Sequence, residues 1–249
     1  MSGSGLSATV WGSPTATKHA ILLHGIIASS QTWWRVGPAL AEQGYLVTAP
    51  DLLGHGTARR GGADQDYKIA ALAEEVLPFF TTGPKYDLVI AHSLGCLVVL
   101  HLLSHLSSKP TRVIFVDPPL YQTRETAEKK AEQFADEATN VKSIEAYMAA
   151  NPRWKREDAA CKVFAAEMCD AAAARGILMQ NIPWDFGHLL SNIPASVDLT
   201  IQAADPSLDP CFRVEEAADY PRVKTQVIRG CKHSIQREAP EVVLEAALA

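Results

Sequence analysis

The chain has 249 residues, 47% of them hydrophobic, with 15 glycines and 15 prolines, and it shows no repeat or low-complexity block. This composition favours a single globular domain and argues against disorder. The formal net charge of −5, from 23 basic and 28 acidic residues, offers no basic stripe for a phosphate backbone. Nucleic acid is therefore not an expected partner.

The N-terminal stretch MSGSGLSATVWG lacks the pattern of a signal peptide, and no apolar run approaches the ~18 residues that a membrane span needs. We therefore expect a cytoplasmic protein without a membrane partner. The five cysteines contain no CxxC pair, which favours reduced thiols over a disulfide or zinc framework. We expect no metal and no cofactor, and the sequence leaves the oligomeric state open.

Apolar runs alternate with helical patterns through the first half of the chain. HAILLH, YLVTAP and DLVIAH each precede a helical pattern, at residues 31–42, 67–80 and 94–106, and a further strand is expected at 112–116. This alternation predicts an α/β fold with a mainly parallel sheet and helices on both faces. The short lead-in leaves room for one strand or a clipped hairpin before the first parallel strand.

The alternation of strand and helix patterns ends at residue 120. From 120 to 194 the sequence is helical and charged, without a strand-like run, and strand patterns resume in VDLTIQAAD and KTQVIRG before an amphipathic C-terminal helix, APEVVLEAALA. We therefore predict that residues 1–119 and 195–249 form an α/β core and that residues 120–194 form a helical lid, or cap, inserted into it.

The segment AHSLG, residues 91–95, places Ser93 between a predicted strand and a predicted helix. This is the context of a nucleophile elbow, in which small neighbours flank a serine on a sharp turn. Ala91 stands where the GxSxG pattern has its first glycine, and Gly95 keeps the second. The alternative is a serine that caps the following helix.

Four segments, in this order and spacing, carry a resemblance to a known family: LLHGIIASSQTW, APDLLGHGTAR, AHSLG and GCKHSIQREAPEVV. The chain resembles the α/β-hydrolase fold superfamily, and within it the serine-nucleophile members with a helical cap, which include esterases and lactonases. The likeness covers nearly the whole chain outside the predicted cap.

The resemblance implies a catalytic triad with Ser93 as nucleophile and His233, in the loop after KTQVIRG, as general base. The acid is expected after the penultimate strand, where LTIQAADPSLDP offers Asp205 and Asp209. We prefer Asp205, because it follows the strand directly. Asp117, after VIFV, remains an alternative, since some relatives supply the acid from that strand end.

The resemblance also implies an oxyanion hole formed by the backbone amides of Ile26 and Leu94. Gly25 would let backbone pass close to the substrate, and His24 and Asp51 are expected to brace the surrounding loops. Aromatic side chains near the site suit an apolar substrate of medium size. The expected substrate-binding residues are Gly25, Trp33, Trp184 and Asp185.

Together these features predict a hydrolase that cleaves an ester, thioester or lactone of a small molecule through an acyl-serine intermediate. A serine at the elbow argues against the aspartate-nucleophile route of haloalkane and ordinary epoxide hydrolysis. One alternative is an epoxide hydrolase or lyase of a natural-product pathway, in which His233 and a carboxylate act as general acid and base. Another is a small-molecule receptor on the same fold.

Overall fold

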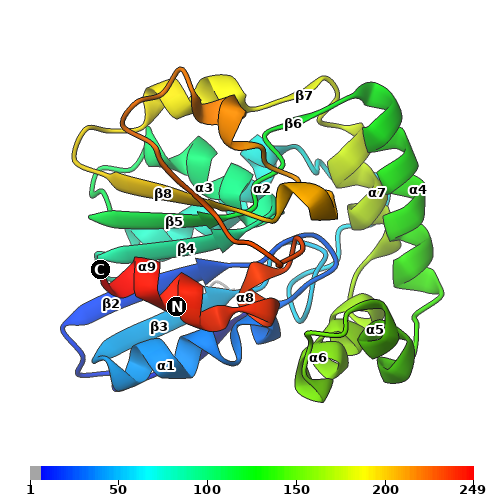
Figure 1. Cartoon of the computed structure of the whole chain (residues 1–249), viewed down its shortest axis with the longest axis horizontal. Helices are drawn as coiled ribbons and strands as arrows, with labels where there is room; N and C mark the ends of the chain where they lie inside the picture. The colour runs from blue at the N-terminus through cyan, green and yellow to red at the C-terminus, as the bar shows by residue number, and fades with distance from the viewer. Residues whose placement is uncertain (1–6) are drawn as a thin grey trace.

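The computed structural model describes residues 7–249. Its main sheet has the order β1-β3-β2-β4-β5-β8-β9, and every neighbouring pair is parallel except β1 with β3. Figure 1 shows this sheet running through the molecule between helices. The predicted α/β fold is confirmed. The strands are β1 (Ala8–Trp11), β2 (Lys18–Leu23), β3 (Tyr45–Pro50), β4 (Leu88–His92), β5 (Arg112–Val116), β8 (Asp198–Ala203) and β9 (Lys224–Val227).

The central strands are apolar on both sides because both faces of the sheet are covered. On β2, Ile21 and Leu23 belong to one buried cluster, whereas Ala20 and Leu22 belong to another. Successive strand residues point to opposite faces, so the continuous apolar run HAILLH serves two cores at once.

Helices cover the two faces in pairs. α1 (Val36–Glu42) and α9 (Pro240–Leu248) pack on one face, and α2 (Ile69–Thr81) and α3 (Leu94–Leu103) pack on the other. The helix predicted at 31–42 is divided, with a 3-10 turn, η1 (Ser30–Trp33), before α1. The remaining short helices of the core are η3 (Pro206–Leu208), η4 (Val214–Ala217) and α8 (Ile235–Glu238).

The lead-in contributes one strand, β1, rather than a hairpin within the described part of the chain. Residues 1–6, and with them half of the stretch from which we expected no signal peptide, lie outside the described residues. No helix within residues 7–249 combines the length and the apolar character of a membrane span.

The segment between β5 and β8 is mainly helical. It holds α4 (Arg124–Thr139), α5 (Ile144–Ala150), α6 (Arg156–Glu167), α7 (Ala171–Met179) and the 3-10 turn η2 (Gly187–Asn192). Figure 1 shows α4 to α7 gathered beyond one end of the sheet. Side chains from this segment line the same cavity as Ser93, which places these helices at the carboxyl end of β4.

The expectation that residues 120–194 contain no strand is wrong in one detail. β6 (Tyr121–Gln122) and β7 (Trp184–Asp185) form a short antiparallel pair, in which Tyr121 faces Asp185 and Gln122 faces Trp184. Two-residue strands leave no alternating pattern in a sequence. The pair ties together the two ends of the helical segment where it leaves and rejoins the core.

Gly95 allows the start of α3 to lie directly against the end of β2. A Cβ atom at this position would lie 2.7 Å from Leu23 O and 2.8 Å from His24 O. These oxygens belong to backbone that carries the next loop of the site, so neither can move freely. A glycine at this point of AHSLG is therefore a packing requirement.

We expect Gly95→Ala to lower the free energy of unfolding by about 1–3 kcal/mol, because the added methyl group overpacks a backbone contact. Urea denaturation measures this change. Gly187→Ala is the matched control, because its Cβ would meet only Asp185 Oδ1, at 3.9 Å, and it should stay within about 0.5 kcal/mol of wild type. Equal stability of Gly95→Ala and wild type would contradict the close packing.

Candidate active site

Ser93 occupies a sharp turn between β4 and α3. Its backbone has φ 52° and ψ −120°, and its side chain makes no capping hydrogen bond to the helix. The Ser93 N–H instead donates to Val116 O at 3.0 Å, which ties the turn to β5. A positive φ at a residue other than glycine is strained and occurs mainly at functional sites. The conformation fits a nucleophile elbow and disfavours the helix-cap alternative.

The loop after β2 lies beside the elbow. A Cβ on Gly25 would come within 2.9 Å of both Ser93 Cβ and His92 Nδ1, so only glycine allows this approach. Leu52 N–H donates to His24 Nε2 at 3.0 Å, and His24 Nδ1–H donates to Gly25 O at 2.7 Å. The buried imidazole thus braces the loop, as the sequence led us to expect.

Two backbone amides beside Ser93 are free to bind a ligand oxygen. Within residues 7–249, no hydrogen bond occupies the N–H of Ile26 or that of Leu94, and both residues line the cavity that Ser93 faces. Ile27, the next residue of the loop, has a positive φ of 46°, and Lys162 Nζ donates to its carbonyl oxygen at 2.9 Å. A strained, braced loop is suited to holding an amide in a fixed direction.

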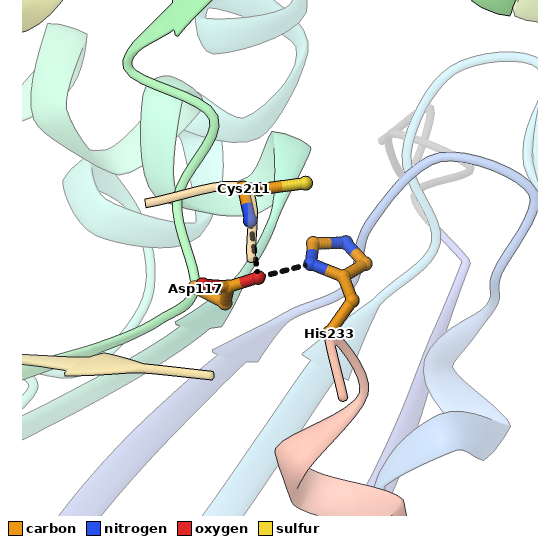
Figure 2. A group of neighbouring side chains, drawn as sticks. All are labelled: Asp117, Cys211 and His233. Carbon is orange, nitrogen blue, oxygen red and sulfur yellow. Dashed lines mark hydrogen bonds and ion pairs between the residues drawn. The ribbon is translucent and has the colours of Figure 1, made fainter. Parts of the chain in front are cut away.

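His233 lies in the loop between β9 and α8, and its ring is oriented by a carboxylate. His233 Nδ1–H donates to Asp117 Oδ2 at 2.6 Å. Figure 2 shows the second ring nitrogen pointing away from Asp117. His92 Nε2 lies 3.1 Å from the backbone oxygen of His233, which holds the loop against the elbow. This arrangement leaves Nε2 of His233 available as a proton acceptor.

Asp117 follows β5 and is completely buried. Besides His233, its carboxylate accepts hydrogen bonds from the backbone N–H groups of Ala204 at 3.2 Å, Cys211 at 2.9 Å and Phe212 at 3.2 Å. Burying a carboxylate is costly unless its oxygens are hydrogen-bonded. These four donors compensate that cost and fix the position of the carboxylate that holds His233.

The prediction that Asp205 contacts His233 is wrong. The Asp205 carboxylate accepts hydrogen bonds from Ser207 N at 2.9 Å, Ser207 Oγ at 2.8 Å and Gly230 N at 2.8 Å. These bonds lower its pKa to about 2, with Gly230 contributing most. Asp205 therefore supports the loop that leads to His233. Asp209, the other candidate, is exposed and makes no hydrogen bond to His233 in the described structure.

Cys211 adds a sulfur atom beside the imidazole. Burial lowers the pKa of His233, but the neighbouring Cys211 sulfur and the Asp117 carboxylate outweigh this effect and raise it to about 10. Both neighbours favour the imidazolium over the neutral ring. This contact could not be predicted from the sequence, because DPCFR is an ordinary loop sequence.

Asp117, Cys211 and His233 also form the one group within residues 7–249 whose side chains have the chemistry and spacing of metal ligands, with donor atoms within 4.8 Å of one another. The Asp117 carboxylate is already engaged by three backbone amides, and His233 Nδ1 by its hydrogen bond to that carboxylate. This bonding fits an oriented acid and base better than a metal centre.

Ser93 and His233 line one cavity of about 300 Å³ beneath the helices between β5 and β8. No hydrogen bond joins Ser93 Oγ to His233 among the described residues. Such contacts are often long in ligand-free sites and tighten when substrate binds. Apolar side chains from several segments complete the lining: Ile27, Phe134, Ile177, Leu178 and Trp184.

Of the four residues predicted to bind substrate, Trp184 lines the cavity and the others do not. Trp33 is fully buried in the cluster beneath α1 and α9, so its predicted place in the pocket is wrong. Asp185 is exposed, because it alternates with the buried Trp184 on β7. Gly25 lies against Ser93 instead of facing the cavity.

Several cavity residues were not foreseen. Trp154, Lys162 and Arg237 all line the cavity. Arg237 belongs to the quoted segment GCKHSIQREAPEVV, yet only the fold shows that its side chain turns towards the site. The two others lie in the helical segment, where charge and aromatic content alone do not indicate which side faces the core.

Comparisons with known proteins agree with the fold. Residues 20–246 match the family described as the alpha/beta hydrolase family. An N-formylmaleamic acid deformylase from Pseudomonas putida is 19% identical, with a TM-score of 0.78 over 98% of this chain and 96% of that chain. The thioesterase domain from the curacin biosynthetic pathway is 21% identical, with a TM-score of 0.75 over 98% and 95% of the two chains.

Among curated sequences, Methylesterase 9 of Arabidopsis thaliana is 33% identical over 116 residues, which are 42% of this chain and 44% of that protein. The match thus spans less than half the length of either protein. A match of this extent does not show which substrate this chain acts on.

We expect nuclear magnetic resonance titration to give His233 a pKa far above 6.5. Cys211→Ser and Asp117→Asn should each lower it, because each removes a neighbour that favours the imidazolium. Cys161→Ser, at another partly buried thiol, is the control and should leave the pKa unchanged.

The raised pKa of His233 also makes the stability of the fold depend on pH. Because the pKa is higher in the folded chain than in the unfolded chain, the protonated ring contributes to the free energy of unfolding. This contribution is complete below about pH 6.5 and is lost as the pH rises towards 10. An unshifted pKa in wild type, or one that neither substitution lowers, would contradict the arrangement of these three side chains.

Proposed function

Because the chain belongs to the alpha/beta hydrolase family, we propose that it cleaves an ester, thioester or lactone of a small molecule through an acyl-enzyme on Ser93. One observation supports this most strongly: the elbow serine, the His233–Asp117 pair and two free amides all converge on one cavity. Acyl transfer needs this combination of nucleophile, base, orienting group and oxyanion donors.

In the proposed reaction, Ser93 Oγ attacks the acyl carbon while its proton passes to Nε2 of neutral His233. The Asp117 carboxylate holds the ring through Nδ1–H and stabilises the imidazolium that forms. The N–H groups of Ile26 and Leu94 bind the oxyanion. Collapse of the intermediate transfers the proton to the leaving oxygen or sulfur, and water, activated by His233, then releases the acid.

The raised pKa of His233 has a consequence for this route. A raised pKa favours the imidazolium in the free site, and the imidazolium cannot accept the serine proton. The rate of acylation therefore increases with pH as the ring loses its proton. A bound substrate that separates Cys211 from His233 would favour the neutral ring.

The cavity suits a substrate of moderate size with a substantial apolar part. Its volume of about 300 Å³ lies at the lower end of the range for small-molecule sites, roughly 300–1,000 Å³. Phe134, Leu178 and Trp184 contribute apolar surface. Trp184 is held in place by donating from Nε1 to Pro119 O at 2.6 Å, so this wall is rigid.

We expect rapid-quench mass spectrometry with p-nitrophenyl butyrate to detect one butyryl group on Ser93. Ser93→Ala should lose this adduct and lower kcat by about 10³-fold or more, because the triad acts as a unit. Ser234→Ala, at a second serine that lines the cavity, should retain the adduct.

The result also distinguishes acyl transfer from general acid–base chemistry. Full turnover by Ser93→Ala, with no adduct in wild type, would contradict the acyl-serine route. It would favour the alternative that the sequence left open, in which His233 and a carboxylate act as general acid and base without an acyl-enzyme.

A further inference from the structure

The cavity carries an excess of positive charge. Its lining includes Lys130, Lys162 and Arg237 but one acidic residue, Asp209, and Asp209 is exposed. The whole chain, in contrast, has a formal net charge of −5. A cationic cavity in an acidic protein focuses an attractive potential for anions at that point.

Arg237 is the most unusual of these cations, because it is only 3% exposed. Its Nε donates to Thr32 Oγ1 at 3.1 Å, and its Cζ lies 4.5 Å from the centre of the Trp154 ring. Neither terminal guanidinium nitrogen has a hydrogen-bond or ion-pair partner among residues 7–249. The side chain is thus held at one edge, with its terminal donors free.

The two carboxylates whose charges act on Arg237, Asp158 and Glu137, are engaged by other groups. Asp158 accepts from Arg35 Nη2 at 2.7 Å, Trp34 Nε1 at 2.9 Å and Lys155 N at 2.9 Å.

Glu137 likewise has partners of its own. It accepts from Tyr147 Oη at 2.7 Å and lies 3.1 Å from Lys162 Nζ. The protein therefore does not use either carboxylate to neutralise Arg237 directly. Burying a charge without an anionic partner is costly in free energy. Here the residue with the unpaired charge, Arg237, lines the cavity.

Lys162 differs from Arg237 because its ammonium is already bonded to Ile27 O and Glu137. Burial lowers its pKa to about 8, against the opposing effect of Glu137, so it remains mainly protonated at neutral pH. Lys162 braces the loop that contains Ile26 and Ile27, whereas the terminal guanidinium N–H groups of Arg237 have no partner among the described residues. Of these two cations, Arg237 is therefore the one available to a ligand.

Arg237 is also close to the reacting groups along the chain. It lies four residues after His233, in α8, and both side chains line the same cavity. The Trp154 ring lies 4.5 Å from the guanidinium carbon, within range of a cation–π contact that restricts the position of the group. A planar guanidinium held in this way presents two parallel N–H donors, which match the two oxygens of a carboxylate.

We propose that Arg237 binds a carboxylate of the substrate, so that the enzyme prefers acyl compounds that carry an acid group in addition to the bond that Ser93 attacks. This inference rests on the proposed function and narrows its substrate class. The apolar walls hold the remainder of the molecule, and the carboxylate fixes the direction in which it enters.

Two esters of matched length test the proposal: the p-nitrophenyl monoester of glutaric acid and p-nitrophenyl pentanoate, each corrected for uncatalysed hydrolysis. They differ at the far end of the acyl chain, which carries a carboxylate in one and a methyl group in the other. We expect wild type to show a kcat/KM at least about 10-fold higher for the acid, as a charge-assisted hydrogen bond implies.

Arg237→Met should reduce kcat/KM for the acid by about 10- to 100-fold and leave that for the pentanoate nearly unchanged. Arg229→Met is the matched control, because it removes a guanidinium that lies outside the cavity and is largely exposed. It should preserve the preference. An equal loss on both esters in Arg237→Met, or no preference in wild type, would overturn the proposal.

Arg237→Lys covers the case in which the methionine variant does not fold. It retains the charge but cannot form two parallel hydrogen bonds, so the preference should fall, chiefly through a higher KM for the acid. Circular dichroism verifies the fold of each variant. A folded Arg237→Lys variant with the full wild-type preference would contradict carboxylate binding by the guanidinium.

A binding experiment separates this inference from the proposed reaction. In the Ser93→Ala background, isothermal titration calorimetry compares 4-phenylbutyrate with 4-phenylbutyramide, and we expect the carboxylate to bind at least about 10-fold more tightly. Adding Arg237→Met should abolish the difference. If the carboxylate binds more tightly than the amide but wild type forms no acyl-enzyme, the proposed hydrolase reaction is wrong and the carboxylate site stands. If wild type turns over esters but binds both ligands equally, the carboxylate site is wrong and the proposed reaction stands.

Discussion

The hydrogen bond between His233 Nδ1 and Asp117 Oδ2, 2.6 Å long, is the interaction on which the site depends. It brings together two residues that are 116 positions apart and fixes the ring so that Nε2 points away from the carboxylate. The three backbone N–H groups that donate to Asp117 offset the free-energy cost of burying its carboxylate. Without that bond, the half-buried imidazole would have no preferred tautomer.

The order of the strands explains why this carboxylate is within reach. β5 is the direct neighbour of β4, which ends at the elbow, whereas β8 lies one strand further away. A residue that leaves β5 at its carboxyl end is therefore closer to Ser93 than one that leaves β8. The positive φ of Asp117, 45°, turns the chain at that point. Asp205 contributes indirectly, through its bond to Gly230 in the His233 loop.

Much of this was accessible from the sequence, and the errors have physical causes. Ser93 and His233 lie in local motifs whose geometry is set by a few neighbouring residues, so their positions were predicted. Asp117 and Asp205 each follow a strand, and only the contacts between strands decide which of them reaches the histidine. Trp33 and Trp154 are both aromatic, but the direction of a side chain depends on how distant segments pack. The free N–H groups of Arg237 cannot be recognised from the sequence, because this requires knowing which groups the surrounding carboxylates bind in the folded chain.

The most direct test of the site is a comparison of kcat for Asp117→Asn and Asp205→Asn with p-nitrophenyl butyrate. The account predicts a loss of about 10⁴-fold for Asp117→Asn, because an amide cannot hold the required tautomer or stabilise the imidazolium. It predicts a kcat close to wild type for folded Asp205→Asn. The reverse order, or equal losses in both variants, would contradict the assignment of Asp117 as the residue that orients His233.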